Sequence, residues 1–277
     1  MKLKRGYKLL LYTILSLGAL VIALPIYLTI VSTLKTDGEM MAHFFSLPSN
    51  PTLATYVEIL TEGEYFTALK NTVVITGVVL AAEIVFLPMF SYPIARRMHS
   101  SRYYKFLYFY AIVGIFIPFQ VKMFPMIKLL NTMEMTNRLG LIFYYLGIQT
   151  CEGVFLISGY LASISDELEE AAYIDGASTR KVFFHIVYPL MKPIIATMII
   201  KNGLWVWNDY FAPSLILAKS RAWRTLPLFQ YAFKQESYTQ YTMLFTAVVL
   251  SMLPIMVIYI VAQKQIIGGM MTGAVKG

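Results

Sequence analysis

Long runs of hydrophobic residues alternate with shorter polar segments along this 277-residue chain. A run of about 20 predominantly apolar residues can cross the hydrocarbon core of a bilayer as a helix. Six runs reach or approach this length, namely 9–34, 71–95, 106–126, 139–164, 193–218 and 241–263. The pattern therefore predicts an all-α integral membrane protein with six transmembrane helices.

The third run, 106–126, is the least regular of the six. Pro118, Gln120, Lys122 and Pro125 lie towards its far end, so its uninterrupted apolar part is shorter than the usual ~20 residues. The polar segment 36–70 contains two further short stretches, 53–60 and 65–69, that predict short helices at the membrane interface.

The segment 167–193 is a clearly polar stretch between two long apolar runs, and it carries the signals of two short helices. Residues 167–173 are rich in helix formers, and Gly176 follows where a left-handed backbone would let the chain turn. Ser178 or Thr179 can cap the second helix, which Pro189 and Pro193 are expected to end.

The second of these helices has a predicted apolar face. Val182, Ile186 and Leu190 recur at every fourth position, with Phe183 and Val187 beside them. Charged and polar residues fall elsewhere on the helix. A helix–turn–helix with such a face, held between two membrane spans, is expected to pack against another surface.

The composition agrees with a membrane protein. Hydrophobic residues make up 58% of the chain and charged residues only 14%, against about a quarter in an average soluble domain. The net charge is +8, but no basic stripe interleaved with aromatic residues indicates a nucleic-acid surface. The single cysteine, Cys151, lies in an apolar run, so no disulfide can form within the chain.

The distribution of Lys and Arg predicts the orientation. Six crossings place both termini and the 167–193 segment on one side, which carries thirteen Lys and Arg against nine on the other. The bias is strongest in the amino-terminal flank and in the cluster 96–105, both close to membrane ends. Because positive residues favour the cytoplasm, the termini and this segment are expected to be cytoplasmic.

The same segment resembles the EAA loop of permease subunits of binding-protein-dependent ABC importers. The resemblance covers Glu170-Ala171-Ala172, Gly176 after three residues, Ile186 after nine more, and Pro189, with Tyr188 standing where leucine is usual. In that family the loop forms a coupling helix that docks on a cytoplasmic ATPase. The resemblance thus implies an ATPase-coupling role for Glu170, Ala171, Ala172, Gly176, Ile186 and Pro189.

Other stretches are similar to the carbohydrate-type permeases of this family. They include Pro25, the segments 32–35, 52–56 and 69–72, and the carboxy-terminal G-x-x-x-G-A-V-K-G over 269–277. This resemblance implies a permease that translocates a sugar or oligosaccharide delivered by a solute-binding protein. It also implies a bacterial or archaeal cell membrane as the location.

The resemblance further implies a set of partner proteins and a division of the chain. The expected partners are a second homologous permease, an extracytoplasmic solute-binding protein, and two copies of a cytoplasmic ABC ATPase that would hold ATP and Mg. The expected regions are an amino-terminal helix and extracytoplasmic loop over 1–70, a five-helix transmembrane domain over 71–264 containing the EAA loop at 165–193, and a cytoplasmic tail over 265–277.

The fifth apolar run carries an unusual set of polar residues. At 100° per residue, Asn202, Trp205 and Asp209 fall close to one line, and Lys201 and Asn208 form an adjacent line. Polar residues inside a membrane usually face a bundle interior or a watery cavity. Amides, a carboxylate and an indole suit a sugar, so Asn202, Trp205, Asn208 and Asp209 are candidate substrate-path residues. Alternatively, Asp209 and Lys201 pair with neighbouring helices and are structural.

No catalytic chemistry is predicted for this chain. It has no G-x-x-x-x-G-K-[ST] phosphate loop and no H-E-x-x-H motif, so the energy for transport is expected from a partner, with no cofactor or metal in this chain. An ion-coupled secondary transporter using Glu83, Glu152 or Asp209 is the alternative, although Glu83 and Glu152 are more readily read as structural. No inverted repeat, common in that class, is evident.

Overall fold

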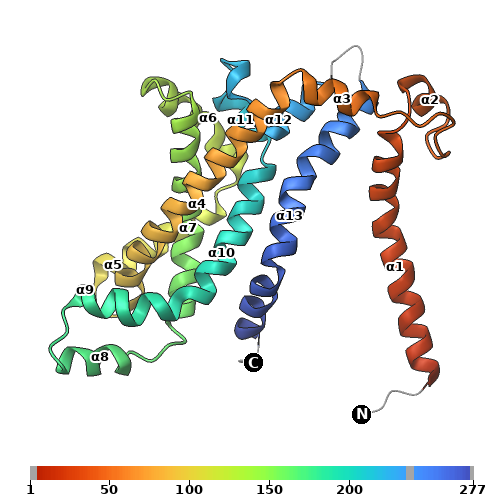
Figure 1. Cartoon of the computed structure of the whole chain (residues 1–277). Coiled ribbons are helices and arrows are strands. Elements are labelled where there is room, and N and C mark those ends of the chain that lie inside the picture. Colours follow the sequence, from red (N-terminus) through yellow and green to blue (C-terminus); the bar gives the residue numbers. More distant parts are fainter. Residues whose placement is uncertain (1–4, 235–239, 275–277) are drawn as a thin grey trace. The chain divides into compact units, whose positions relative to one another are not determined.

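The protein is described by a computed structural model that covers residues 5–234 and 240–274. Over these residues the chain is built from helices and contains no β-strand (Figure 1). In chain order the elements are α1 (Arg5–Ser32), α2 (Asp37–Ala42), α3 (Ala54–Thr61), α4 (Glu64–Arg97), α5 (Arg102–Phe116), α6 (Phe119–Thr132), α7 (Arg138–Leu161), α8 (Glu167–Ile174), α9 (Thr179–Val182), the π-helical segment η1 (Phe183–Val187), α10 (Tyr188–Asn208), α11 (Phe211–Ile216), the 3-10 turn η2 (Arg221–Trp223), α12 (Leu226–Tyr231) and α13 (Tyr241–Ala274).

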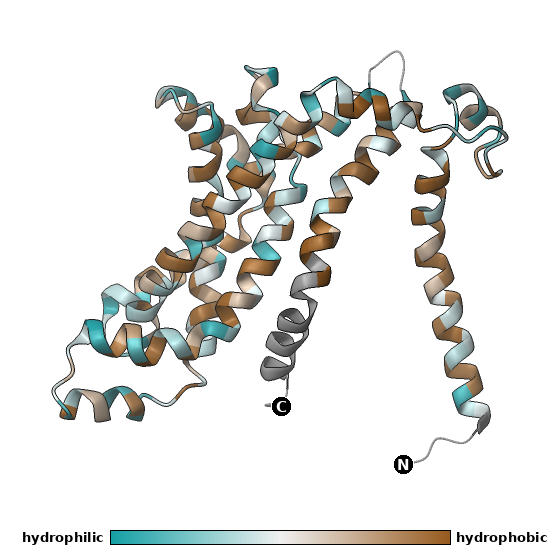
Figure 2. Ribbon diagram, in the orientation of Figure 1, coloured by the Kyte–Doolittle hydropathy of each residue, from teal (hydrophilic) through white to brown (hydrophobic). Residues whose placement is uncertain are grey.

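The helices confirm the predicted fold class. Among the described residues, five helical stretches are long and apolar enough to cross a membrane: Gly6–Ser32, Glu64–Arg97, Arg138–Leu161, Thr179–Asn208 and Tyr241–Ile258. Figure 2 shows hydrophobic residues along most of α1, whereas α8 and α9 carry hydrophilic residues among hydrophobic ones. The chain is therefore a multi-pass helical membrane protein.

The third predicted span, 106–126, is not one continuous helix. The chain forms α5 and α6, which are bent by 105° at a short break, so the pair is either a broken span or a re-entrant loop. Pro118 causes the break, because the residue before a proline is driven out of the α-helical region. Ile117 accordingly has an extended backbone, with φ −74° and ψ 116°.

Two predicted helix ends are also wrong. Pro189 and Pro193 do not end the second helix of the 167–193 segment, because helical structure continues from Thr179 through η1 and α10 to Asn208. The fifth span was predicted to reach residue 218, but the helix stops at Asn208 and α11 follows separately. Likewise, 65–69 is the first part of α4, whereas the predicted short helix at 53–60 is confirmed as α3.

The widened helical turn of η1 accommodates Pro189. In a regular α-helix the proline ring would clash with the carbonyl of His185, four residues earlier, and a π-turn relieves such a clash by adding one residue. The extra residue shifts the buried face. Val182, Val187 and Met191 are buried, whereas Leu190 of the predicted face is 37% exposed.

The structure consists of two compact units, which we describe separately. Over the described residues, the first comprises 5–66, 229–234 and 240–254. In it the Asp37 carboxylate accepts hydrogen bonds from the amide and hydroxyl groups of Thr242, at 3.0 and 2.7 Å. The fully buried Lys35 donates to the carbonyls of His43 and Phe44, at 2.8 and 3.0 Å. These hydrogen bonds hold the chain after α2 against the end of α1.

Over the described residues, the second unit comprises 67–228 and 255–274, and it contains the predicted site residues. Helices α4, α7 and α10 form its centre, with α6 and α11 at one end and α8 and α9 at the other (Figure 1). One apolar core joins α7 to α6, α10 and α11, and includes Leu130, Leu141, Tyr145, Val206 and Ile216. A second core packs the helical segment after Gly176 onto α4 and α7, and includes Leu87, Ile157, Leu161, Val187 and Met191.

The side chains of the carboxy-terminal G-x-x-x-G-A-V-K-G segment are not among those that the structure describes. Its first six residues, 269–274, belong to the end of α13, which continues past the predicted end of the sixth span at 263. The division into regions 1–70, 71–264 and 265–277 remains a prediction.

Candidate functional site

The 167–193 segment forms the predicted helix–turn–helix, with a left-handed glycine between its helices. Gly176 has φ +80°, a backbone conformation that residues with a side chain rarely adopt. The Ser178 hydroxyl accepts a hydrogen bond from the Lys181 amide at 3.4 Å, and so caps α9 as one of the two predicted alternatives. Three acidic residues lie in the first turn of α8, where the helix dipole favours negative charge.

The proposed coupling residues do not all face the same way. Glu170 and Ala171 are exposed on α8, whereas Ala172 packs on the second apolar core. Leu168 and Ile174 are also exposed, by 53% and 87%. The exposed face of α8 therefore combines a carboxylate with large apolar side chains, a combination suited to docking on another protein.

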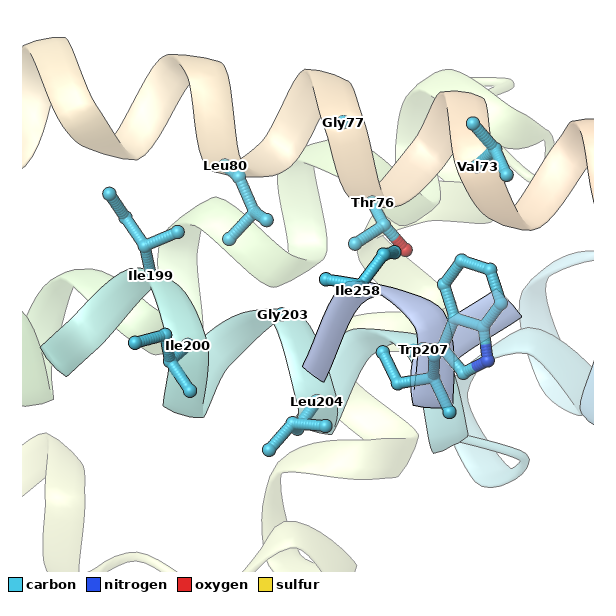
Figure 3. A pocket seen from close by; sticks show the side chains of 11 residues that line it. Val73, Thr76, Gly77, Leu80, Ile199, Ile200, Gly203, Leu204, Trp207 and Ile258 are labelled. Atoms are coloured by element: carbon cyan, nitrogen blue, oxygen red, sulfur yellow. The ribbon is translucent and has the colours of Figure 1, made fainter. Parts of the chain in front are cut away.

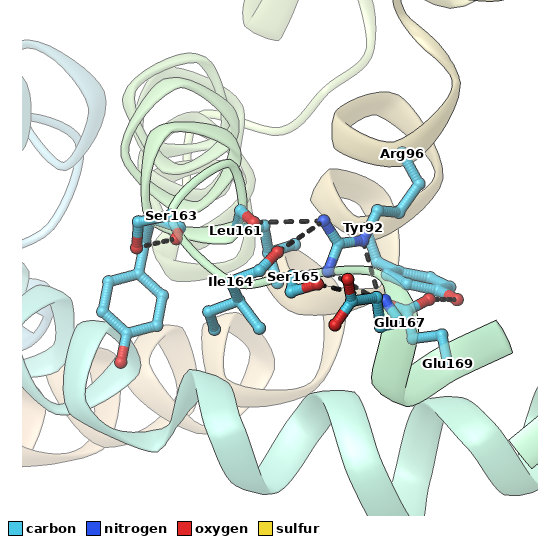
Figure 4. A network of polar contacts seen from close by, with 9 residues as sticks. Tyr92, Arg96, Leu161, Ser163, Ile164, Ser165, Glu167 and Glu169 are labelled. Atoms are coloured by element: carbon cyan, nitrogen blue, oxygen red, sulfur yellow. Dashed lines mark hydrogen bonds and ion pairs between the residues drawn. The ribbon is translucent and has the colours of Figure 1, made fainter. Parts of the chain in front are cut away.

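Glu169, next to the motif, holds α8 in place, and sequence reasoning missed it. Its side chain is only 8% exposed and forms an ion pair with Arg96 of α4 at 2.7 Å. The Tyr92 hydroxyl donates to its second carboxylate oxygen at 2.6 Å. Figure 4 shows this network between the end of α4 and the start of α8. The sequence shows a glutamate directly before Glu170 and a distant basic cluster at 96–105, but no local pattern that pairs the two.

Arg96 also ties the end of α7 to this network. Its guanidinium donates to the carbonyls of Leu161 and Ile164, at 3.1 and 3.2 Å. These carbonyls lie at and just beyond the carboxyl end of α7, where backbone oxygens lack helical partners. One arginine therefore joins α4, α7 and α8, and it fixes the loop to the transmembrane helices.

The polar residues of α10 separate onto two faces. Asn202 is buried and donates to a carboxylate oxygen of Glu83 on α4 at 2.8 Å. Lys201, Trp205 and Asn208 are exposed on the other face. The expectation that Asn202 shares a face with Trp205 and Asp209 is therefore wrong, because Asn202 is turned into the helix packing.

Trp205 and Asp209 meet around Tyr145 of α7. The Tyr145 hydroxyl donates to Asp209 at 3.0 Å, and its ring lies edge-on to Trp205 with centroids 5.5 Å apart. The other oxygen of Asp209 accepts from the Phe211 amide at 3.0 Å. Asp209 follows the last residue of α10, so it links the end of that helix to α7 and α11.

Lys201 forms an ion pair with Glu152 of α7. Their side chains remain 49% and 39% exposed, although both lie within candidate membrane spans. Charged groups at such depth face water or another protein rather than lipid. The exposed polar face of α7 and α10 therefore consists of Lys201, Glu152, Trp205 and Asn208.

An apolar pocket of about 360 Å³ lies between α4 and α10. Figure 3 shows its lining, which includes Thr76, Gly77, Leu80, Gly203 and Trp207. A sugar needs several polar partners for its hydroxyl groups, and this lining is almost entirely hydrocarbon. The pocket is thus a poor candidate for the substrate path. Among the described residues no group of three or more His, Cys, Asp or Glu could hold a metal ion.

Comparison with known proteins identifies the class. Residues 84–271 match the family of binding-protein-dependent transport system inner membrane components, and the chain belongs to that family. It is 38% identical over 268 residues to the multiple sugar-binding transport system permease protein MsmG of Streptococcus mutans, with 96% of each protein covered. It is 32% identical to the melibiose/raffinose/stachyose import permease protein MelC of Bacillus subtilis, over 92% of this chain and 91% of MelC.

The fold has a counterpart among solved structures. A chain of a bacterial ABC transporter involved in the import of the acidic polysaccharide alginate aligns with a TM-score of 0.79 at 21% identity, covering 95% of this chain and 99% of its own. At this identity the likeness concerns the fold. The resemblance to carbohydrate-type ABC importer permeases is confirmed, and this chain is a transport subunit of that class.

Proposed function

We propose that this chain is one of two membrane subunits through which an ABC importer moves a sugar or oligosaccharide into the cell. The observation that carries the substrate class is the 38% identity to a multiple sugar-binding transport system permease over 96% of both proteins. The energy would come from ATP hydrolysis in two copies of a partner ATPase, with Mg bound there. A solute-binding protein would deliver the sugar from outside.

The exposed face of α8 supports the ATPase-coupling role. Glu170 offers a charge and Ile174 a large exposed apolar side chain, while Glu169 anchors the helix from behind. The excess of Lys and Arg on this side supports a cytoplasmic location for the loop and both termini. In this proposed orientation the segment 36–70 would lie outside the cell.

Charge reversal at Glu170 tests the docking face. The tagged chain, purified from host membranes in mild detergent, should retain a different permease subunit and two ATPase copies per complex. Glu170→Lys should reduce the retained ATPase about tenfold, equivalent to ~1.4 kcal/mol, and leave the permease pair intact. Glu62→Lys, an exposed reversal just after α3, is the control and should retain both partners. Full ATPase retention by Glu170→Lys would contradict the proposed docking.

The exposed polar face of α7 and α10 is the proposed substrate path. Its indole, amide and ion pair provide a stacking surface and hydrogen-bonding groups for sugar rings and hydroxyls. The contacts of Asp209 with Tyr145 and Phe211 support a positioning role for this carboxylate. The buried pairing of Asn202 with Glu83 supports a structural role for that amide.

Cysteine accessibility tests this path in a Cys151→Ser background. Trp205→Cys and Asn208→Cys should react with a water-soluble thiol reagent, and bound sugar should slow both reactions. Asn202→Cys and Val206→Cys are matched controls, because these neighbouring positions are only 3% and 5% exposed. Trp205→Ala should lower uptake several-fold, as expected for the loss of ~1 kcal/mol of stacking. No labelling at Trp205→Cys and Asn208→Cys, or labelling that bound sugar leaves unchanged, would exclude this face as the path.

A further inference from the structure

An open cavity of about 630 Å³ lies where the end of α4 meets the loop helices α8 and α9. Its lining combines the charged end of α4 with residues of α5, α8, α9 and η1. Three arginines line it, namely Arg96, Arg97 and Arg180, together with the single carboxylate of Glu169. The cavity is separate from the exposed polar face of α7 and α10.

Two of the three arginines are left with their charge unmatched. The charge of Arg96 is neutralised by its ion pair with Glu169 at 2.7 Å. Arg97 and Arg180 are exposed, and neither forms an ion pair with any residue that the structure describes. The Arg97 guanidinium instead lies 5.8 Å from the ring centre of Tyr104. The cavity thus holds a net charge of +2 and favours an anion.

Part of the cavity lining is apolar, and on α4 this part extends into the candidate membrane span Glu64–Arg97. Met89 and Phe184 belong to this part and are 46% and 52% exposed. Met89 precedes Arg97 by eight residues on α4, which corresponds to a depth of about 12 Å along the helix. A ligand that fills this cavity needs a negative group at one end and hydrocarbon at the other.

We propose that the cavity binds an anionic phospholipid. Its phosphate would lie between Arg97 and Arg180, and an acyl chain would run along Met89 and Phe184. Basic pockets at the cytoplasmic ends of membrane helices are suited to such headgroups. Because Arg97 belongs to α4 and Arg180 to α9, the bound lipid would bridge the transmembrane bundle to the coupling loop. The lipid therefore supports the loop orientation that Arg96 and Glu169 set.

Native mass spectrometry of the purified complex tests the proposal without measuring transport. Dioleoylphosphatidylglycerol and dioleoylphosphatidylcholine are added separately at equal concentration, since they share their acyl chains and differ in net charge. We expect the complex to retain adducts with dioleoylphosphatidylglycerol and not with dioleoylphosphatidylcholine. Arg97→Gln and Arg180→Gln should each reduce adduct occupancy about fivefold, and the double variant by more than tenfold. Arg97→Lys and Arg180→Lys should keep most of the binding.

Two nearby cations provide the matched controls. Arg102 and Lys105 belong to the same basic cluster and are exposed, but neither lines the cavity. Arg102→Gln and Lys105→Gln should therefore leave the adducts unchanged. Equal losses of adduct occupancy in the four single glutamine variants, at 97, 102, 105 and 180, would mean that the lipid is attracted to surface charge alone and would overturn the proposal. So would competition by millimolar inorganic phosphate, which would indicate a site for the phosphate alone. Loss of the ATPase from Arg97→Gln with unchanged lipid adducts would mean that a protein partner fills the cavity.

Discussion

Arg96→Ala is expected to abolish sugar uptake and to lower the thermal stability of the complex. The substitution leaves the Glu169 carboxylate, 8% exposed, without its cation, and it frees the carbonyls of Leu161 and Ile164. Removing one partner of a buried ion pair costs about 3 kcal/mol or more, because the remaining charge is uncompensated. Without Arg96, α8 loses its ion pair with α4 and its polar link to the end of α7, and it keeps the Tyr92 hydrogen bond and the packing of Ala172. We expect this weaker attachment to be insufficient to pass ATP-driven motion to the transmembrane helices.

Uptake in proteoliposomes and the midpoint of thermal unfolding measure this effect. Arg96→Lys should recover part of the stability, because a lysine can pair with Glu169 but cannot reach all the acceptors that a guanidinium fork serves. Arg102→Ala, an exposed change at the start of α5, is the control and should transport normally. Wild-type uptake and stability in Arg96→Ala would show that the network does not support the loop.

Gly140→Ala is expected to prevent normal folding of the α6–α7 connection. A Cβ atom at this position would lie 1.7 Å from the Met135 carbonyl oxygen and 2.8 Å from its carbon. The neighbouring backbone cannot yield easily, because the Asn137 side chain accepts from the amides of Leu139 and Gly140, at 2.9 and 3.1 Å. Relieving the clash must break this helix cap, at a cost of about 3 kcal/mol.

The yield of assembled complex after size-exclusion chromatography measures this loss. Gly147→Ala is a matched control on the same helix, because nothing lies within 4 Å of a Cβ built there. That variant should assemble at least as well as the parent chain, since alanine favours a helix over glycine by up to about 1 kcal/mol. Equal yields from Gly140→Ala and Gly147→Ala would contradict the close approach at Met135.

Most of the spans could be predicted from the sequence, because a membrane-spanning helix requires an apolar run of about 20 residues and the other apolar stretches of this chain are shorter. The sequence could also place the left-handed turn, since Gly176 and the capping Ser178 act locally. It misplaced the helix end at Pro189, because a π-turn can absorb a proline and then shifts the buried face by one residue. Local sequence patterns do not reveal that shift.

Partnerships between distant residues were the other part that the sequence could not provide. Glu169 and Glu170 are adjacent and chemically identical, yet one is buried against Arg96 and the other is exposed. Similarly, Asn202 and Trp205 are 60° apart on a helical projection, close enough to be grouped together. Only the packing of α4 against α10 places Asn202 with Glu83 and leaves Trp205 on the open face.

Sugar uptake by the reconstituted complex tests the central claim most directly. The complete complex is placed in proteoliposomes with its solute-binding protein on one side and ATP on the opposite, cytoplasmic side. Uptake of a panel of radiolabelled oligosaccharides is then recorded with ATP, with a non-hydrolysable analogue, and with ATP plus a protonophore. The account predicts uptake of at least one sugar that requires hydrolysable ATP and persists with the protonophore. Uptake that proceeds without ATP and collapses with the proton gradient would contradict it.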